Sequence, residues 1–176
     1  MKRLLGGLIL AASIFVPTSG LHADQAKGEA TASKAWYEDH WIDLTASWDG
    51  ATACDVRDDI TICYATEAAM DAELDARKAA SDLTLLASCS TSLRLYDGTS
   101  YSGAVLNLST RTTILNLSVY GFDNLTSSYK VGACDSDFYS AANLGGSLYS
   151  GSTGAGSQAS SMLSGWNNVL SSVYIS

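Results

Sequence analysis

"GFDNLTSSYKV", residues 121–131, and "GWNNVLSSVYI", residues 165–175, are two versions of one pattern that recurs after 44 positions. Each copy has a glycine, an aromatic residue, two Asp or Asn residues, a two-residue spacer and then Ser-Ser. Each copy also ends in residues that favour β-strands. A pattern duplicated at matched register indicates two structural units of the same kind.

A second duplication lies upstream of each copy. "YDGTSYSG", residues 96–103, has the spacing Y-x-x-x-x-Y-x-G, and "YSAANLGG", residues 139–146, repeats it as Y-x-x-x-x-L-x-G. The two duplications divide the end of the chain into two consecutive units, residues 91–131 and 132–176, with strand and turn signals but no helical period. Neither unit has enough apolar residues to fold alone. We therefore expect the two to pack face to face as an antiparallel β-sandwich with Greek-key connections.

The repeated cluster is rich in side-chain oxygen. Its donors are Asp123, Asn124, Thr126, Ser127, Ser128, Asn167, Asn168, Ser171 and Ser172. No nitrogen or sulfur ligand lies nearby in the sequence, which disfavours zinc, copper and iron, whereas amide, hydroxyl and carbonyl oxygens suit Ca²⁺ before Mg²⁺. Only Asp123 is charged, so we expect weak affinity, roughly 10⁻⁵ to 10⁻³ M. For one copy alone, turn capping would be the better explanation, but two copies at matched register favour the cation.

These motifs resemble those of the βγ-crystallin domain, the module of eye-lens crystallins and microbial Greek-key proteins. That family marks each Greek key with an aromatic-x-x-x-x-aromatic-x-Gly corner, which Tyr96, Tyr101 and Gly103 match in full. The second corner places Leu144 at the second aromatic position. Calcium-binding members carry [N/D]-[N/D]-x-x-[S/T]-S, and both "DNLTSS" and "NNVLSS" satisfy it. The resemblance covers residues 91–176.

The resemblance implies two symmetric calcium sites at one end of the sandwich, each built from both motifs. The implied ligands are the hydroxyls of Ser127 and Ser171, the carbonyls of Leu125 and Val169, side-chain oxygens from Asp123, Asn124, Asn167 and Asn168, and the corner carbonyls of Thr99 and Ala142. Which member of each Asp/Asn pair touches the ion stays open. Both motif serines are intact, so two bound Ca²⁺ ions are expected.

Residues 1–23 have the features of a signal peptide. Lys2 and Arg3 form a positive start, residues 4–16 are apolar, and small residues follow. The apolar run is too short for a comfortable membrane span. We therefore expect a mature chain that begins near Asp24 and is secreted, into either the extracellular space or the periplasm, with no membrane span.

The charge of the chain excludes two classes of partner. The net charge is −8 for the whole sequence, and removal of Lys2 and Arg3 with the signal peptide takes it to −10. Nucleic acid and anionic membranes both need a basic surface, so neither is an expected partner. Cations and basic proteins remain as partners, beside simple solubility.

Four cysteines, Cys54, Cys63, Cys89 and Cys134, lie in the expected mature chain. An even number in a secreted protein indicates two disulfides, with three possible connectivities. A two-residue turn at residues 58–59 would place Cys54 opposite Cys63, within disulfide range. Cys89 then pairs with Cys134 by elimination.

The fold class expected for the whole chain is mainly β. Residues 24–88 form a small α+β region, a hairpin plus a helix, before a βγ-crystallin domain over residues 89–176. Thr66 is expected to cap a helix over residues 67–80. The tryptophan-rich stretch 36–49 is interpreted as a surface loop with buried tryptophans. The region bears a fainter likeness to segments that precede crystallin-type domains in exported bacterial proteins, with no activity attached.

An enzyme is one alternative to a binding module. Acidic and aromatic residues that might be taken for a glycan-cleaving cleft are Glu38, Asp39, Asp43 and Asp49 among Trp36, Trp41 and Trp48. The expected mature chain has only His40, with no Gly-x-Ser-x-Gly and no His-Glu-x-x-His. A surface loop explains these residues with fewer assumptions, so no catalytic residue is assigned.

A secreted metalloproteinase inhibitor is the other alternative. Some microbial metalloproteinase inhibitors and killer-toxin-like proteins are single crystallin-type domains, secreted and disulfide-bonded. A secreted protease or a cell-surface component is therefore a further candidate partner beside calcium, although no residue marks a reactive loop. The expected function is an exported, calcium-stabilised β-sandwich that binds and protects.

Overall fold

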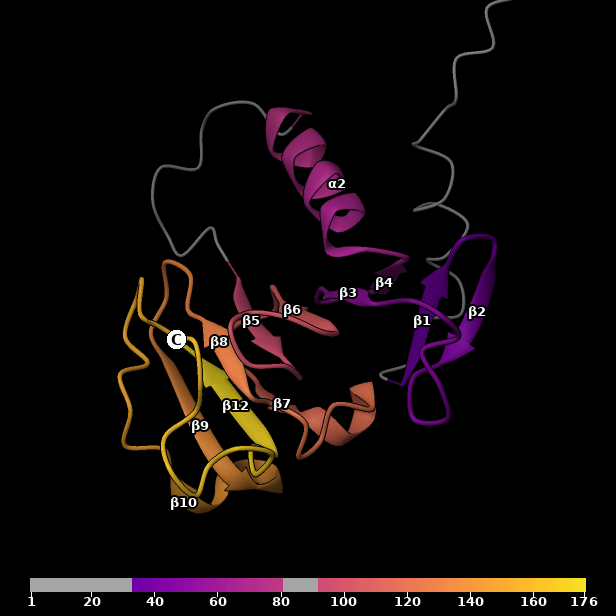
Figure 1. The fold of residues 1–176 in the computed structure, drawn as a ribbon. Helices are drawn as coiled ribbons and strands as arrows, with labels where there is room; N and C mark the ends of the chain where they lie inside the picture. The colour runs from indigo at the N-terminus through magenta and orange to yellow at the C-terminus, as the bar shows by residue number, and fades with distance from the viewer. Residues whose placement is uncertain (1–32, 81–91) are drawn as a thin grey trace, which may run out of the picture.

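The computed structural model describes residues 33–80 and 92–176, which are mostly β (Figure 1). The strands are β1 (Lys34–Tyr37), β2 (His40–Asp43), β3 (Ala53–Val56), β4 (Thr61–Tyr64), β5 (Leu93–Tyr96), β6 (Val105–Leu108), β7 (Ile114–Asn116), β8 (Ser128–Lys130), β9 (Ser136–Ala141), β10 (Gly145–Leu148), β11 (Gln158–Ala159) and β12 (Ser172–Ile175). The helices are α2 (Glu67–Ala80) and the short 3₁₀ helices η1 (Leu117–Tyr120) and η2 (Ala142–Leu144).

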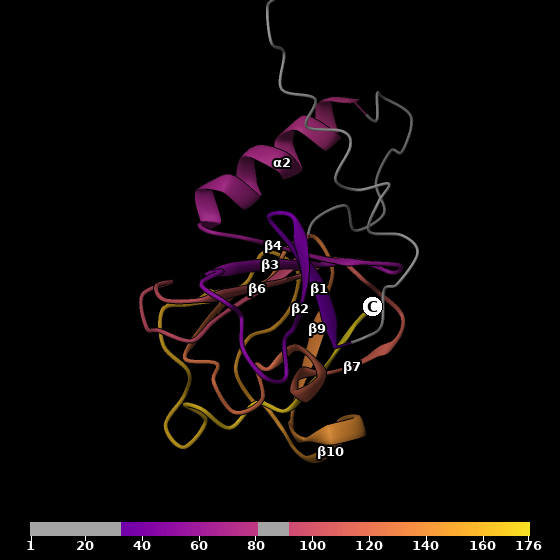
Figure 2. The ribbon, with the colours of Figure 1, turned by 90° about the vertical axis from the view of Figure 1, so that its right-hand side faces the viewer.

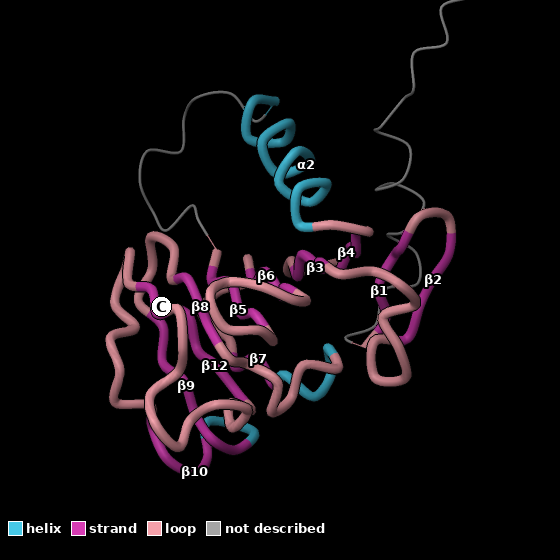
Figure 3. Tube along the Cα trace, in the orientation of Figure 1, coloured by secondary structure: helices cyan, strands magenta, loops and turns pink. Residues whose placement is uncertain are grey.

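The strands form two sheets. One has the order β11-β8-β5-β6-β3-β4-β1-β2, and the other has the order β10-β9-β12-β7. In the C-terminal half each repeat unit lends one strand to the other. β11 of the second unit pairs with β8, and β7 of the first pairs with β12 (Figure 3). Neither unit completes its own sheet. This agrees with the expectation that neither unit has enough apolar residues to fold alone. The expected Greek-key sandwich of antiparallel strands is confirmed.

The duplicated corners have the same backbone. Each has two consecutive residues and then a glycine in the left-handed region, namely Ser100, Tyr101 and Gly103 in the first unit and Asn143, Leu144 and Gly146 in the second. Leu144 has a φ of 59°, the same value as Tyr101. The change from aromatic to leucine therefore leaves the second corner intact.

The N-terminal region extends the first sheet. β3 runs parallel to β6 along its whole length, and the hairpin β3–β4 places Cys54 opposite Cys63 in a disulfide. The expected bridge is thus confirmed. The second expected bridge includes Cys89, which lies outside the described residues, so its pairing with Cys134 stays a prediction. The described residues on both sides of this gap share one hydrophobic core.

The interpretation of residues 36–49 as a surface loop is wrong for their first part, because β1 and β2 form a hairpin there. β1 also pairs in parallel with β4, so its backbone is hydrogen-bonded on both edges. Ala35 and Ile42 point into the core. Trp36 and Trp41 are half-buried and pack edge to face, with ring centroids 5.5 Å apart. Alternation of buried and exposed residues along both strands is what the sequence interpretation overlooked.

Helix α2 lies on the face of the long sheet opposite the short sheet (Figure 2). Thr66 caps it as expected, since the Ala69 amide donates to Thr66 Oγ1 at 3.1 Å. Met70 is fully buried against Tyr96 and Val105 in a small second core. No helix in the described part of the chain is long and apolar enough to cross a membrane.

A buried carboxylate fixes this helix to both halves of the chain. Asp55 on β3 is 0% exposed. It accepts hydrogen bonds from Arg57 Nε at 2.7 Å, from Arg77 Nη2 of α2 at 2.8 Å and from Asn107 Nδ2 of β6 at 2.7 Å. A second group on the same face joins Arg94 of β5 to Asp71 and Glu67 of α2. The contact between helix and sheet therefore combines these ion pairs with the apolar packing of Met70.

The Asp55 network predicts a stability loss in acid. Burial acts to raise the pKa of Asp55, but the hydrogen bond and charge of Arg57, the Asn107 amide and the charge of Arg77 outweigh it and lower the pKa below the ordinary 3.8. Because the pKa is lowered in the folded state, the ionised carboxylate stabilises the folded protein above pH 3.8. This stabilisation is lost as the pH falls through the folded-state pKa. Urea unfolding at pH 5 and pH 3 should show this loss, and the loss should be smaller in Asp55→Asn. An equal loss in both proteins would assign the acid sensitivity to other carboxylates.

Candidate metal site at the repeated loops

The two repeated motifs form loops that lie against each other. The backbone amide of Asn124 donates to the Leu170 carbonyl at 2.9 Å, and the amide of Asn168 donates to the Thr126 carbonyl at 3.0 Å. Each bond is the counterpart of the other after a shift of 44 residues. The loops are therefore related by an approximate twofold axis, as the duplicated sequence requires.

Serine and asparagine side chains also cross between the loops. Ser127 Oγ donates to Asn168 Oδ1 at 3.1 Å, and Ser171 Oγ donates to Asn124 Oδ1 at 3.3 Å. Both asparagines are in the left-handed backbone region, with φ of 56° and 58°, a conformation that Asn tolerates better than most residues. The structure thus brings together four of the predicted site residues as two matched oxygen pairs.

Burial differs within each pair. Ser127 and Ser171 are 5% and 7% exposed, whereas both asparagines are exposed. Asp123, the one carboxylate of the motifs, accepts a hydrogen bond from Asn124 Nδ2 at 3.1 Å. Each pair thus has a fixed hydroxyl on the protein side and an amide oxygen on the solvent side, and the first loop adds a negative charge next to its asparagine.

The last serine of each motif has a separate role. Ser128 Oγ donates to the Gly98 carbonyl at 2.6 Å and accepts from the Tyr101 amide at 3.0 Å. Ser172 makes the same two bonds, to the Ala141 carbonyl and from the Leu144 amide. These serines fasten each corner to its loop. The signal for this role was the identical Ser-Ser ending of both copies, which the sequence interpretation used only as an oxygen source.

The remaining predicted ligands lie at the edges of this arrangement. Thr99 and Ala142 each directly follow a residue whose carbonyl accepts a hydrogen bond from the last serine of a motif. The Thr99 carbonyl accepts from Ser102 Oγ, and the Ala142 carbonyl accepts from the Gly145 amide. Three further predicted ligands lie within the loops: Leu125, Asn167 and Val169. No hydrogen bond between described residues joins these five positions to the serine–asparagine pairs.

The donor set determines which ions fit. Among the described residues no three His, Cys, Asp or Glu side chains come together, which disfavours transition metals. Hydroxyl and amide oxygens that meet across a gap between two loops suit a hard cation of flexible coordination. The hydroxyl of Thr126 in the first loop is fully buried and has no partner in the described part.

The matched corners and the paired loops occur together in one two-sheet Greek-key sandwich, as the sequence resemblance implied. Solved structures similar to the chain are βγ-crystallin domains. Among similar solved structures is a βγ-crystallin from Ciona intestinalis, 21% identical, which covers 48% of this chain and 99% of its own at a TM-score of 0.41. A βγ-crystallin domain from Clostridium beijerinckii is also 21% identical, over 48% of this chain and 97% of its own, with a TM-score of 0.40.

A third similar structure is a double mutant of clostrillin in complex with nickel, 20% identical, which covers 48% of this chain and 97% of its own at a TM-score of 0.40. No family model matches the sequence of the chain. No curated protein matches it either. Each of these three similarities covers about half of this chain and nearly the whole of the other.

The acidic residues of the first hairpin have neighbours of their own. His40 Nε2 lies 2.9 Å from Asp49 Oδ2, and its Nδ1 lies 3.3 Å from Asp39 Oδ1. The hydrogen bonds to Asp49 and Asp39 raise the pKa of His40. Asp43 Oδ1 accepts from both the amide and the hydroxyl of Thr45. These contacts hold the hairpin and its following turn, and they give the carboxylates a structural role.

Proposed function

We propose that the crystallin domain binds two Ca²⁺ ions between the loops 123–128 and 167–172, and that these ions stabilise an exported, non-catalytic protein. The observation that supports this most is the reciprocal pair of side-chain contacts, Ser127 with Asn168 and Ser171 with Asn124. Two equal oxygen pairs at symmetric positions favour two ions over one.

The ligands proposed for the ions are those of the sequence motifs: Thr99, Asp123, Asn124, Leu125, Ser127, Ala142, Asn167, Asn168, Val169 and Ser171. A bound Ca²⁺ supplies an electrostatic link between oxygens of both repeat units. Only Asp123 offsets the charge of the bound Ca²⁺ within the loops. We therefore propose a Kd at the weak end of the range for calcium-binding proteins, about 10⁻³ M. The last serines hold the corners against the loops and so position the corner carbonyls.

Export and a non-catalytic role are part of the same proposal. The Cys54–Cys63 disulfide supports an oxidising compartment, and the signal sequence expected over residues 1–23 lies outside the described residues. The sequence of residues 92–176 contains no histidine, which supports binding or protection over acid–base catalysis. No contact in the described part specifically favours protease inhibition, so that alternative is not developed.

Calcium titration tests the proposal. With a Kd of about 1 mM, 5 mM Ca²⁺ stabilises the folded state by about 1 kcal/mol per site, so the Tm should rise by about 4–8 °C. Calorimetry should detect two sites. Trp166, beside Asn167 and packed on Tyr149 with ring centroids 5.1 Å apart, should report binding by fluorescence. No heat and no change in Tm at millimolar Ca²⁺ would refute the metal assignment.

Arginine substitutions separate the two sites. Ser127→Arg and Ser171→Arg each replace a buried hydroxyl ligand with a cation, so each should remove one site of the two. Ser150→Arg is the control, because Ser150 is exposed and lies outside both loops. Loss of both sites in the control, or retention of both in either loop variant, would contradict the assigned ligands.

A further inference from the structure

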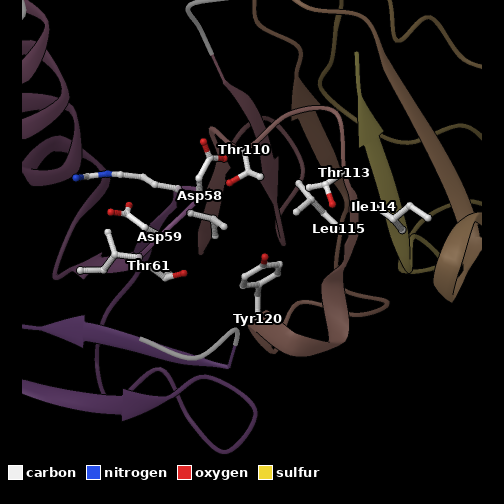
Figure 4. A pocket seen from close by; sticks show the side chains of 11 residues that line it. Asp58, Asp59, Thr61, Thr110, Thr113, Ile114, Leu115 and Tyr120 are labelled. Carbon is white, nitrogen blue, oxygen red and sulfur yellow. The ribbon is translucent and has the colours of Figure 1, made fainter. Parts of the chain in front are cut away.

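A pocket of about 310 Å³ lies between the N-terminal region and the crystallin domain (Figure 4). The turn of the hairpin β3–β4 forms one side, and the segment before β7, β7 itself and the end of η1 form the other. Its volume is at the lower limit for small-ligand sites in proteins. None of the proposed metal ligands lines it, so it is a separate site.

Tyr120 supplies a polar atom at the base of this pocket. The residue is 7% exposed, and its hydroxyl has no hydrogen-bond partner among the described residues. Figure 4 shows the hydroxyl pointing into the space between the labelled side chains. Burial raises the pKa of Tyr120, so the hydroxyl stays neutral and its oxygen can accept a hydrogen bond. The hydroxyl itself is not among the buried polar atoms that lack a partner, so it is open to the pocket, where water or a ligand can bond to it.

The rim of the pocket is negative. Asp58 and Asp59 form the turn of the β3–β4 hairpin, and Asp58 is exposed, with no ion pair in the described part of the chain. Arg57 also lines the pocket, but its Nε is bound to the buried carboxylate of Asp55 at 2.7 Å. Asp55 is shared with Arg77, so the charge of Arg57 is only partly offset. The lining still carries two carboxylates, Asp58 and Asp59, against this one guanidinium.

The wall of the pocket is apolar. Val56, Ile60 and Leu115 line it and are nearly fully buried. Thr110 adds a hydroxyl that is buried and has no partner in the described regions. The lining thus combines a carboxylate rim, the hydroxyls of Tyr120 and Thr110 and an aliphatic wall.

This combination excludes several classes of ligand. An anion would meet the carboxylates of Asp58 and Asp59. A transition-metal ion would lack ligands, because no three His, Cys, Asp or Glu side chains converge in the described part. A sugar usually stacks on an exposed aromatic face, whereas the ring of Tyr120 is buried. A wholly apolar molecule would leave both hydroxyls unpaired.

We propose that the pocket binds a small organic cation, with an ammonium or guanidinium group at Asp58 and the Tyr120 hydroxyl and a short aliphatic chain along Val56, Ile60 and Leu115. Carboxylate and phenol oxygens accept hydrogen bonds from such a head group. The aliphatic wall contributes apolar burial. A free amine and the lysine side chain of a partner peptide have the same chemistry.

A series of ligands matched in shape tests the charge requirement. Pentylammonium, 1-pentanol and pentanoate differ mainly in charge and can be titrated into the ¹⁵N-labelled chain in saturating Ca²⁺. Pentylammonium should shift the amides of residues 56–61 and 110–120 and bind about tenfold more tightly than 1-pentanol. Pentanoate should not bind. Equal shifts from all three ligands, or no shifts in these segments with pentylammonium, would overturn the proposal.

Two substitutions test the residues. Asp58→Asn and Tyr120→Phe keep the size of each side chain and should each weaken pentylammonium binding by about tenfold. Asp137→Asn is the control, since Asp137 is an exposed carboxylate on β9, outside the pocket. Each variant should retain the Tm of the unaltered chain within a few degrees, which separates loss of binding from unfolding. Unchanged binding in both pocket variants would overturn the assignment.

The source of the cation is tested with a peptide. Nα-acetyl-lysine-methylamide and a Gly-Lys-Gly peptide carry the ammonium group of lysine on a peptide backbone. Agmatine carries a guanidinium group on an aliphatic chain without a peptide backbone. Tighter binding of the lysine compounds would identify a protein partner, and tighter binding of agmatine or pentylammonium would identify a free amine. Absence of binding by all of them would refute a cation site.

Discussion

Replacement of Asp55 by alanine is expected to lower the free energy of unfolding by about 3–5 kcal/mol. The carboxylate is fully buried and is the common acceptor for Arg57, Arg77 and the Asn107 amide. Without it, two guanidinium groups keep their partly buried positions and lose their counter-charge. A loss of this size is a large fraction of the stability of an ordinary domain.

Asp58→Ala is the matched control for this experiment. Asp58 lies on the same hairpin but is exposed, so its removal should change stability by no more than about 0.5 kcal/mol. Urea unfolding followed by tryptophan fluorescence and by circular dichroism measures both variants. A loss in Asp55→Ala no larger than in the control would mean that the ionic network contributes nothing net to the fold.

The same measurement tests how the two halves of the chain depend on each other. Asp55 is on β3, Arg77 on α2 and Asn107 on β6, so the network joins the N-terminal region to the crystallin fold. The parallel pairing of β3 with β6 also joins these two parts of the chain, and so does the hydrophobic core that they share. We therefore expect one cooperative unfolding transition, seen equally by both probes.

The features predicted from the sequence depend on short-range signals. The duplicated corners and loops, the helix after Thr66 and the Cys54–Cys63 hairpin are each specified within a few residues. Turn residues, caps and a two-residue hairpin act locally, so their geometry can be inferred from spacing alone. The duplication predicted that the two units pack together, but it did not predict that they exchange β7 and β11.

The features that the sequence did not predict depend on long-range contacts. Nothing in residues 53–56 indicates that this strand pairs with residues 105–108 across the intervening helix. The buried position of Asp55 depends on Arg57 of the same hairpin and on Arg77 and Asn107 from two distant segments, which no local pattern relates. Trp48 similarly packs on Phe122, with ring centroids 5.6 Å apart, although 74 positions separate them in the chain.

Gly121→Ala is expected to destabilise the protein far more than Gly165→Ala, although the two glycines open the two copies of the repeated pattern. Both have a left-handed backbone, with φ of 64° and 80°. An added Cβ at Gly121 would overlap the backbone carbonyl oxygen of Leu44, whereas nothing lies within 4 Å of one at Gly165. Leu44 and Trp48 belong to the segment by which the N-terminal region packs on the first copy, where Trp48 Nε1 donates to the Tyr120 carbonyl at 2.9 Å.

The difference between the two variants therefore measures the contact between the two regions. Gly165→Ala should cost only the left-handed strain, about 1 kcal/mol, whereas Gly121→Ala adds a forced shift of the Leu44 backbone and should cost about 3–4 kcal/mol. Urea unfolding in saturating Ca²⁺ compares both variants with the unaltered chain and keeps the metal loops in one state. Equal losses would show that the Leu44 segment moves aside without cost, and the contact would then contribute little. A loss specific to Gly121 would show that the two copies differ because only one of them supports the N-terminal region.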